Sequence, residues 1–155
     1  MTQEDKQLLL KDLCARLPYG VKVRIESDWF YDEREPYDTA LKSEVLGHLI
    51  ADVYSVKPYL RPMSSMTDDE REGFWYSVLD MNWREYLYCE DDNEEMETAP
   101  FPFTENGCGF YLDNFYLHDS FAVIDWLNAH HFDYRELIEK GLALEAPEGM
   151  YNIKE

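Results

Sequence analysis

Basic residues are scarce in this sequence. Lysine and arginine total 14 against 33 aspartates and glutamates, so the formal net charge is −19. A chain with this charge repels the phosphates of nucleic acids and the headgroups of anionic lipids. The composition therefore disfavours direct binding of DNA, RNA or a membrane surface.

Long apolar runs and cysteines are also few. The sequence has no uninterrupted apolar stretch of about 18 residues, and Met1–Lys6 is polar with no signal-peptide core after it. The 3 cysteines, at positions 14, 89 and 108, are too widely spaced for a Cys-x-x-Cys unit. We expect a cytoplasmic protein with reduced thiols, no cofactor and no bound metal.

Apolar and aromatic residues, by contrast, are plentiful. Of 155 residues, 45% are hydrophobic and 15% aromatic, whereas disordered chains combine high charge with few aromatics. We expect one folded domain over residues 1–155, because this length and composition supply a sizeable core.

Two helix starts carry strong local signals. Thr2 is followed three residues later by Asp5, and Thr67 by Glu70, the arrangement of a capping box. The first helix should stop at Pro18–Gly20, and the second should run past Phe74 to Leu79. In the last third, Asp119 or Ser120 should cap a short helix and Asp133 another that ends at Gly141. The expected stripe of the former is Phe121, Ile124 and Leu127.

Alternating apolar residues predict strands elsewhere. Residues 21–26 alternate, residues 37–53 fit a hairpin, residues 57–62 must be extended around two prolines, and Phe110–Leu117 is typical of a buried strand. The expected fold class is α+β. A small, mainly antiparallel sheet would be covered by an amino-terminal helix, a central helix and two short carboxy-terminal helices.

Two segments resemble known sequences. They are 57–67 (KPYLRPMSSMT) and the tail from Asp119 through 126–135 (WLNAHHFDYR) to 146–151 (APEGMY). Both resemble segments of uncharacterised proteins of gut Bacteroidales genomes, which are often encoded in prophage or mobile-element regions. The resemblance implies an intracellular setting. That family carries no established activity, so no catalytic residue is transferred.

Several reactive side chains invite an enzymatic interpretation. Cys108 lies between glycines, ten residues before His118, and could form a Cys/His nucleophile in a small hydrolase, but its surroundings are too acidic to stabilise a thiolate. Paired carboxylates could serve the same class, although 33 acids will form pairs by chance. Adjacent His130 and His131 diverge on a helix, so they favour a helix end over a metal site.

Clustered acid is the strongest anomaly. Segments 26–38, 68–72 and 90–97 have net charges of −5, −3 and −6, which sum to −14 of the total −19. The sequence favours a non-catalytic module that binds a protein partner, and a mimic of nucleic acid that occupies a basic partner is its most specific form. The candidate binding residues in these clusters are Asp28, Asp32, Glu33, Glu35, Glu90, Asp91, Asp92, Glu94, Glu95 and Glu97.

Overall fold

The structure is a computed structural model that describes residues 1–27, 35–51, 54–78 and 117–151. The chain divides into two compact units, one of Met1–Pro62 with Asn128–Glu155 and one of Met63–Leu127, called unit 1 and unit 2 below. Each is described by itself. The single domain that the sequence favours stays a prediction.

Helix α1, Gln3–Arg16, opens unit 1 and begins as predicted. The Thr2 hydroxyl accepts a hydrogen bond from the Asp5 N–H at 3.1 Å, and the Asp5 carboxylate accepts one from the Thr2 N–H at 3.0 Å. A short 3-10 turn over Leu17–Tyr19 follows, and Gly20 then reverses the chain at φ 67°. Glycine suits that position because it has no Cβ to clash there.

The sheet of unit 1 has four strands in the order β2-β1-β3-β4. Strand β1, Lys22–Ser27, pairs antiparallel with β2, Tyr37–Ala40, and with β3, Tyr54–Leu60. Strand β4, Leu144–Glu145, runs parallel to β3. The α+β class is confirmed, but the sheet is mixed because of β4.

Strand β3 is prolonged by a second parallel contact. Arg61 forms a bridge with Phe132. The Arg61 N–H donates to the His131 carbonyl and the Asp133 N–H donates to the Arg61 carbonyl, both at 2.8 Å. The segments on either side of unit 2 are therefore fastened to each other within unit 1.

Residues 43–50 correct the predicted hairpin over residues 37–53. Among the described residues of that range, 37–51, β2 is the only strand, and Ser43–Ile50 forms helix α2, which buries Val45 and Leu49. These two residues are four apart, and that spacing satisfies a helix as well as an alternating strand. Packing decides for the helix, because α2 adds both side chains to the core.

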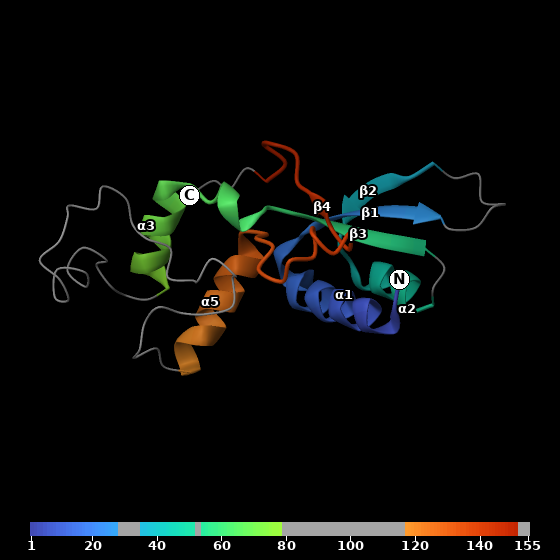
Figure 1. The fold of residues 1–155 in the computed structure, drawn as a ribbon, viewed down its shortest axis with the longest axis horizontal. Coiled ribbons are helices and arrows are strands. Elements are labelled where there is room, and N and C mark those ends of the chain that lie inside the picture. The colour runs from blue at the N-terminus through green and yellow to red at the C-terminus, as the bar shows by residue number, and fades with distance from the viewer. Residues whose placement is uncertain (28–34, 52–53, 79–116, 152–155) are drawn as a thin grey trace, which may run out of the picture. The chain divides into compact units, whose positions relative to one another are not determined.

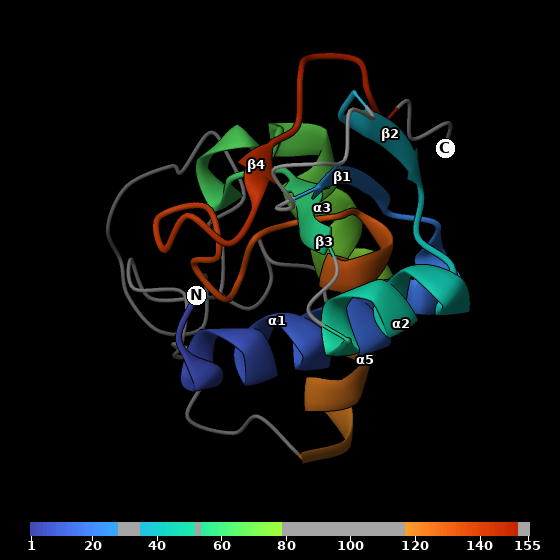
Figure 2. The ribbon, with the colours of Figure 1, turned by 90° about the vertical axis from the view of Figure 1, so that its right-hand side faces the viewer.

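Both helices of unit 1 cover the same face of its sheet (Figures 1 and 2). The core of unit 1 lies between these two helices and the sheet. It is completed by residues 137–143 of the carboxy-terminal segment, which follows α5. Its members are Leu9, Leu13, Val21, Val23, Ile25, Leu41, Val45, Leu49, Val56, Leu60, Leu137, Leu142 and Ala143.

Unit 2 contains helix α3, Asp68–Ser77, and most of helix α5, Leu117–Ala129. The capping box predicted at Thr67 and Glu70 is present, with the Glu70 N–H donating to the Thr67 hydroxyl at 3.2 Å. The rings of Phe74 and Trp126 meet edge to face at 5.1 Å. The strand predicted over residues 110–117 lies outside the described residues except for Leu117, which belongs to α5.

The carboxy-terminal segment corrects a second prediction. Residues 133–140 form turns, so only one carboxy-terminal α-helix is found among the described residues. Asp133 does act as a cap, accepting from the N–H groups of Leu137 and Ile138 at 2.9 and 2.8 Å. Glu136 interrupts a helix because its φ is 58°, in the left-handed region. Gly141 adopts φ 69° at the predicted stop.

Among the parts of the chain that the structure describes, no helix combines the length and apolar character needed to cross a bilayer.

Candidate functional site

Most of the acidic residues singled out from the sequence lie outside the described residues. They are Asp28, Asp32, Glu33, Glu90, Asp91, Asp92, Glu94, Glu95 and Glu97. Glu35 is described and exposed, just before β2. The prediction that these carboxylates form one binding surface therefore stays a prediction. Cys108 and the side chain of His118 are also outside the described part.

The histidine pair lies directly after α5, which ends at Ala129 as the sequence predicts. His131 adopts φ 61° and is 6% exposed. Burial, reinforced by the charge of Arg16, lowers the pKa of His131 to about 4. At neutral pH the His131 ring is therefore uncharged. Within the described ranges, no three His, Cys, Asp or Glu side chains cluster as a metal site would require.

A buried ionic cluster joins α1 to the carboxy-terminal segment of unit 1. Asp12 and Arg16 are both 0% exposed, and the Arg16 Nε lies 2.7 Å from the Asp12 Oδ2. The other carboxylate oxygen of Asp12 lies 3.2 Å from the Arg135 Nε. Both guanidinium groups stand over the Tyr134 ring, at 5.3 Å for Arg16 and 4.8 Å for Arg135. One buried carboxylate is thus shared by two cations.

This cluster is not fully satisfied. The Arg16 Nη2 donates to the Phe132 carbonyl at 2.7 Å, but the Arg16 Nη1 and the His131 Nδ1 find no hydrogen-bond partner among the described residues. Leaving buried polar atoms unpaired costs stability, so such atoms are uncommon in folded proteins. Asp12 and Arg16 are fully buried and do not line the groove beside β3, and we assign the cluster a structural role.

Tyr151 attaches the end of the carboxy-terminal segment to strands β1 and β3. Its hydroxyl accepts a hydrogen bond from the Lys22 N–H and donates one to the Tyr59 carbonyl, both at 2.9 Å. Its ring lies 3.8 Å from the His131 ring. Burial raises the pKa of Tyr151 to about 12, so the hydroxyl remains a donor over the physiological range.

Unit 2 exposes aromatic side chains beside acid. On α3, Tyr76 is 51% exposed and shares a helix face with exposed Asp69. On α5, Phe121 is 71% exposed, one turn from exposed Asp125. The predicted stripe of α5 is therefore wrong at Phe121; among residues 121–129, whose burial is described, the buried apolar side chains are Val123 and Leu127.

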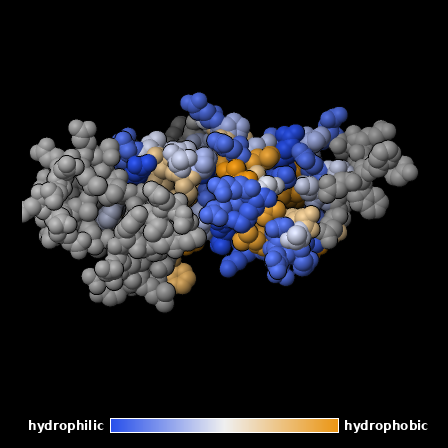
Figure 3. All heavy atoms as spheres, in the orientation of Figure 1, coloured by the Kyte–Doolittle hydropathy of each residue, from blue (hydrophilic) through white to orange (hydrophobic). Residues whose placement is uncertain are grey.

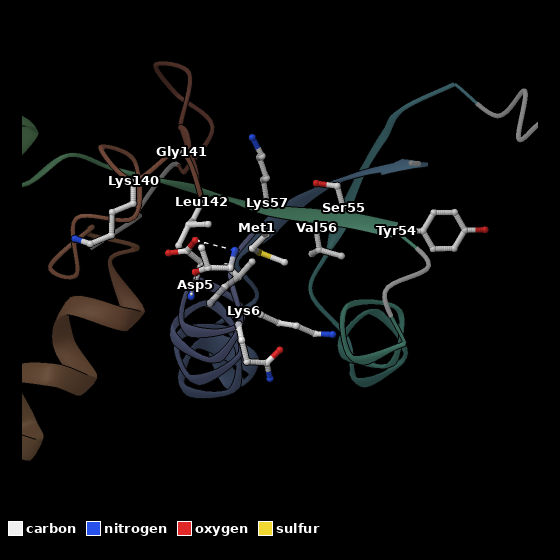
Figure 4. Close-up of a pocket in the computed structure, with 13 residues that line it drawn as sticks. Met1, Asp5, Lys6, Tyr54, Ser55, Val56, Lys57, Lys140, Gly141 and Leu142 are labelled. Atoms are coloured by element: carbon white, nitrogen blue, oxygen red, sulfur yellow. Dashed lines mark hydrogen bonds between the residues drawn. The ribbon is translucent and has the colours of Figure 1, made fainter. Parts of the chain in front are cut away.

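Unit 1 contains a groove of about 590 Å³ beside β3 (Figure 4). Its walls come from the first turns of α1, from Tyr54–Lys57 of β3 and from residues 140–142. Three lysines line it, although acidic residues outnumber basic ones in the whole chain. Pockets that bind small molecules have volumes of roughly 300–1,000 Å³, so the groove is of suitable size.

Comparison of this chain with protein-family models, with curated proteins and with solved structures finds no match. The functional argument therefore rests on its own residues.

Sequence reasoning missed three of these features. Asp12 and Arg16 lie four apart on a helix, a spacing that indicates an ion pair, but burial of that pair depends on residues 132–135. No pattern in the sequence around Tyr76 indicates that its side chain is exposed. The groove brings together α1, β3 and residues 140–142, which no pattern along the chain connects.

Proposed function

We propose that this chain is an intracellular protein-interaction module that binds a basic protein partner through unit 2. The observation that carries the proposal is the exposure of Tyr76 and Phe121 next to carboxylates. Tyr and Phe are enriched at protein interfaces relative to the rest of the surface. The neighbouring carboxylates favour a cationic partner.

Charge on α3 supports the same choice of partner. Residues 68–72 contain four acids and one arginine, and that arginine, Arg71, approaches Asp68 at 3.8 Å. Because Asp68 and Asp69 are exposed, their field extends into solvent. At about 0.15 M salt this field decays over about 8 Å, so it acts on a partner at close range. A nucleic-acid mimic, in which acidic clusters occupy the cationic groove of a DNA- or RNA-binding protein, is the specific form of this proposal.

The test compares two variants with the wild-type protein as bait in extract treated with nuclease. The first variant carries Tyr76→Ser and Phe121→Ser in unit 2. The matched control carries Ile50→Ser, which removes a side chain of unit 1 that is 58% exposed and lies outside the acidic segments. We expect a basic protein to be retained by the wild type and the control and lost from the unit 2 variant.

Salt and competitor DNA complete the test. A basic partner held by charge should be released at about 0.5 M salt, because screening weakens the attraction. Displacement by added DNA would support the mimic form. Retention that is unchanged at high salt, or equal loss from both variants, would refute a basic partner bound by unit 2.

A further inference from the structure

Strand β2 is the outermost strand of the sheet in unit 1, which has the order β2-β1-β3-β4. On the side away from β1, β2 has no neighbouring strand among the described residues (Figures 1 and 2). A strand in this position presents main-chain N–H and C=O groups with which a further strand can pair. The free edge of β2 is therefore a place where another chain can extend the sheet.

The ladder with β1 shows which groups of β2 face outward. The Leu41 N–H donates to the Val21 carbonyl at 2.8 Å, so the main chain of Leu41 faces β1. Peptide groups alternate between the two sides of a strand, so those of Thr39 also face β1, whereas those of Asp38 and Ala40 face away from it. Asp38 and Ala40 are both exposed. Their main-chain groups form no hydrogen bond within the described ranges, which leaves two donors and two acceptors at the surface.

Main-chain hydrogen bonds, and not an apolar patch, would hold a strand at this edge. In Figure 3 the visible surface around β1 and β2 is mainly blue, that is, hydrophilic. Proline and charged side chains protect many edge strands from association. Here Pro36 lies just before the strand, and the Asp38 carboxylate accepts a hydrogen bond from the Tyr59 hydroxyl at 3.1 Å and lies 3.7 Å from the Arg24 guanidinium. The charge of Asp38 is thus balanced within its own sheet.

The edge of β2 is complementary to itself. In an antiparallel pair centred on Thr39, Asp38 of each copy lies opposite Ala40 of the other, and each of these pairs exchanges two N–H···O bonds. Thr39 then faces Thr39 of the second copy, a cross-strand pair that is favourable. Exposed Lys42 is diagonal to Asp38 of the second copy, within reach of its carboxylate.

The two neighbouring symmetric registers are less suitable. Centring the pair on Asp38 sets two carboxylates directly opposite each other, which is unfavourable. Centring it on Ala40 requires main-chain bonds from Lys42, whose carbonyl already accepts from the Val45 N–H at 3.0 Å where α2 begins. The register centred on Thr39 needs only the outward groups of β2 itself.

We infer that β2 pairs antiparallel with β2 of a second copy of this chain, through Asp38 and Ala40, and joins the two sheets across a two-fold axis. The inference concerns unit 1 and is independent of the partner proposed for unit 2. Each copy carries a formal charge of −19, so the copies repel each other at long range. Salt screens this repulsion and should strengthen the association, whereas it should weaken the binding of a basic partner.

Sedimentation equilibrium of the full chain tests the inference. Concentrations from about 10 µM to about 1 mM are needed, because a contact through one short strand is smaller than a standard interface and is expected to be weak. We expect a reversible equilibrium between monomer and dimer. Its dissociation constant should be lower at about 0.5 M salt than at about 0.05 M salt.

Two substitutions of Ala40 locate the contact. Ala40→Pro removes the outward N–H, and proline is tolerated on an edge strand where its nitrogen faces solvent. The matched control, Ala40→Ser, keeps that N–H. The proline variant should raise the dissociation constant at least about ten-fold, because one intermolecular hydrogen bond is lost from each copy, and the serine variant should leave it unchanged. Urea denaturation of the dilute proteins checks that both variants keep the fold.

Disulfide crosslinking determines the register and does not depend on the proline variant. In a chain whose 3 cysteines are replaced by serine, Thr39→Cys should form an intermolecular disulfide under mild oxidation. Directly opposed residues of this kind of pair have Cα atoms about 4.5 Å apart, which suits a disulfide. Gln7→Cys, at an exposed position of α1, is the matched control and should crosslink far more slowly.

Three results would overturn the inference. They are a monomer at every concentration and salt, a dimer that Ala40→Pro and Ala40→Ser affect equally, and crosslinking at equal rates through Thr39→Cys and Gln7→Cys. The first would exclude a second copy at this edge, the second would indicate a dimer formed through another surface, and the third would indicate random collision.

Discussion

Arg16 of α1 donates a hydrogen bond of 2.7 Å to the backbone carbonyl of Phe132, a residue 116 positions further along the chain. The same guanidinium pairs with buried Asp12 one turn earlier. A single side chain therefore connects the first helix to the segment that follows unit 2. Because Phe132 also bridges Arg61, this contact holds α1 beside the point where the chain leaves and re-enters unit 1.

Replacing Arg16 by methionine should be strongly destabilising. Asp12 would remain buried with only Arg135 as a charged partner, and breaking one side of a buried ion pair costs about 3–5 kcal/mol. Urea denaturation measures the free energy of unfolding. Lys11→Met, on the exposed side of the same helix, should change it by less than about 0.5 kcal/mol.

The double variant Asp12→Asn with Arg16→Met separates burial of charge from loss of packing. Removing the carboxylate charge together with its partner should recover part of the lost stability. A loss below about 1 kcal/mol for Arg16→Met alone would show that the pair is not buried in solution.

Acid should destabilise unit 1 through His131. Its pKa is about 4 in the folded state and 6.5 in the unfolded chain, so the unfolded state takes up a proton first as the pH falls. The contribution of a neutral His131 is thus fully present above pH 6.5 and is lost as the pH falls towards 4. We expect a loss of about 2 kcal/mol over that window.

His131→Asn is the variant that isolates this effect. Asparagine tolerates the left-handed φ of 61° at this position and does not titrate. The stability of this variant should fall less between pH 6.5 and 4 than that of the wild type. Parallel pH profiles for wild type and His131→Asn would contradict the buried neutral ring.

Thr67→Ala should loosen the start of α3. The substitution removes the hydroxyl that accepts from the Glu70 N–H, and loss of such a cap costs about 1 kcal/mol. Hydrogen exchange of amides in the first turns of α3 should become about five-fold faster. Thr67→Ser keeps the hydroxyl and should leave the exchange rates unchanged; equal acceleration in both variants would refute the cap as the cause.

Tyr151→Phe should weaken the attachment of the carboxy-terminal segment. The variant leaves the Lys22 N–H without its acceptor and the Tyr59 carbonyl without its donor, at a cost of about 1–3 kcal/mol. Urea denaturation again measures the change. Tyr37→Phe, at an exposed site in β2, is the matched control and should have no measurable effect.

Sequence signals identified those parts of the fold that depend on neighbours along the chain. The capping boxes at Thr2 and Thr67 are local hydrogen-bond arrangements, so α1 and α3 begin where predicted. The alternation of β1 reflects one buried and one solvated face, which the sheet provides. These features require no information from distant residues.

The predictions of secondary structure are wrong where contacts with residues far away in the sequence determine the local conformation. Val45 and Leu49 fit a strand or a helix until the core of unit 1 selects α2. Asp133 signals a cap, but the φ of Glu136 turns the following residues away from a helix. Strand β4 is two residues long and has no recognisable pattern; it exists because β3 offers it a partner. The candidate acidic surface depends on residues outside the described ranges, and the groove on three separated segments.

The place of Leu137, Leu142 and Ala143 in the core of unit 1 sets an order for folding during synthesis. The ribosome releases the first 62 residues early, but the side chains that complete their core emerge only after all of unit 2 has been made. Domains generally fold as they emerge, yet here α1 and strands β1–β3 must wait with exposed apolar surface. The acidic character of the nascent chain, by repulsion between neighbouring copies, would then protect it from aggregation during that interval.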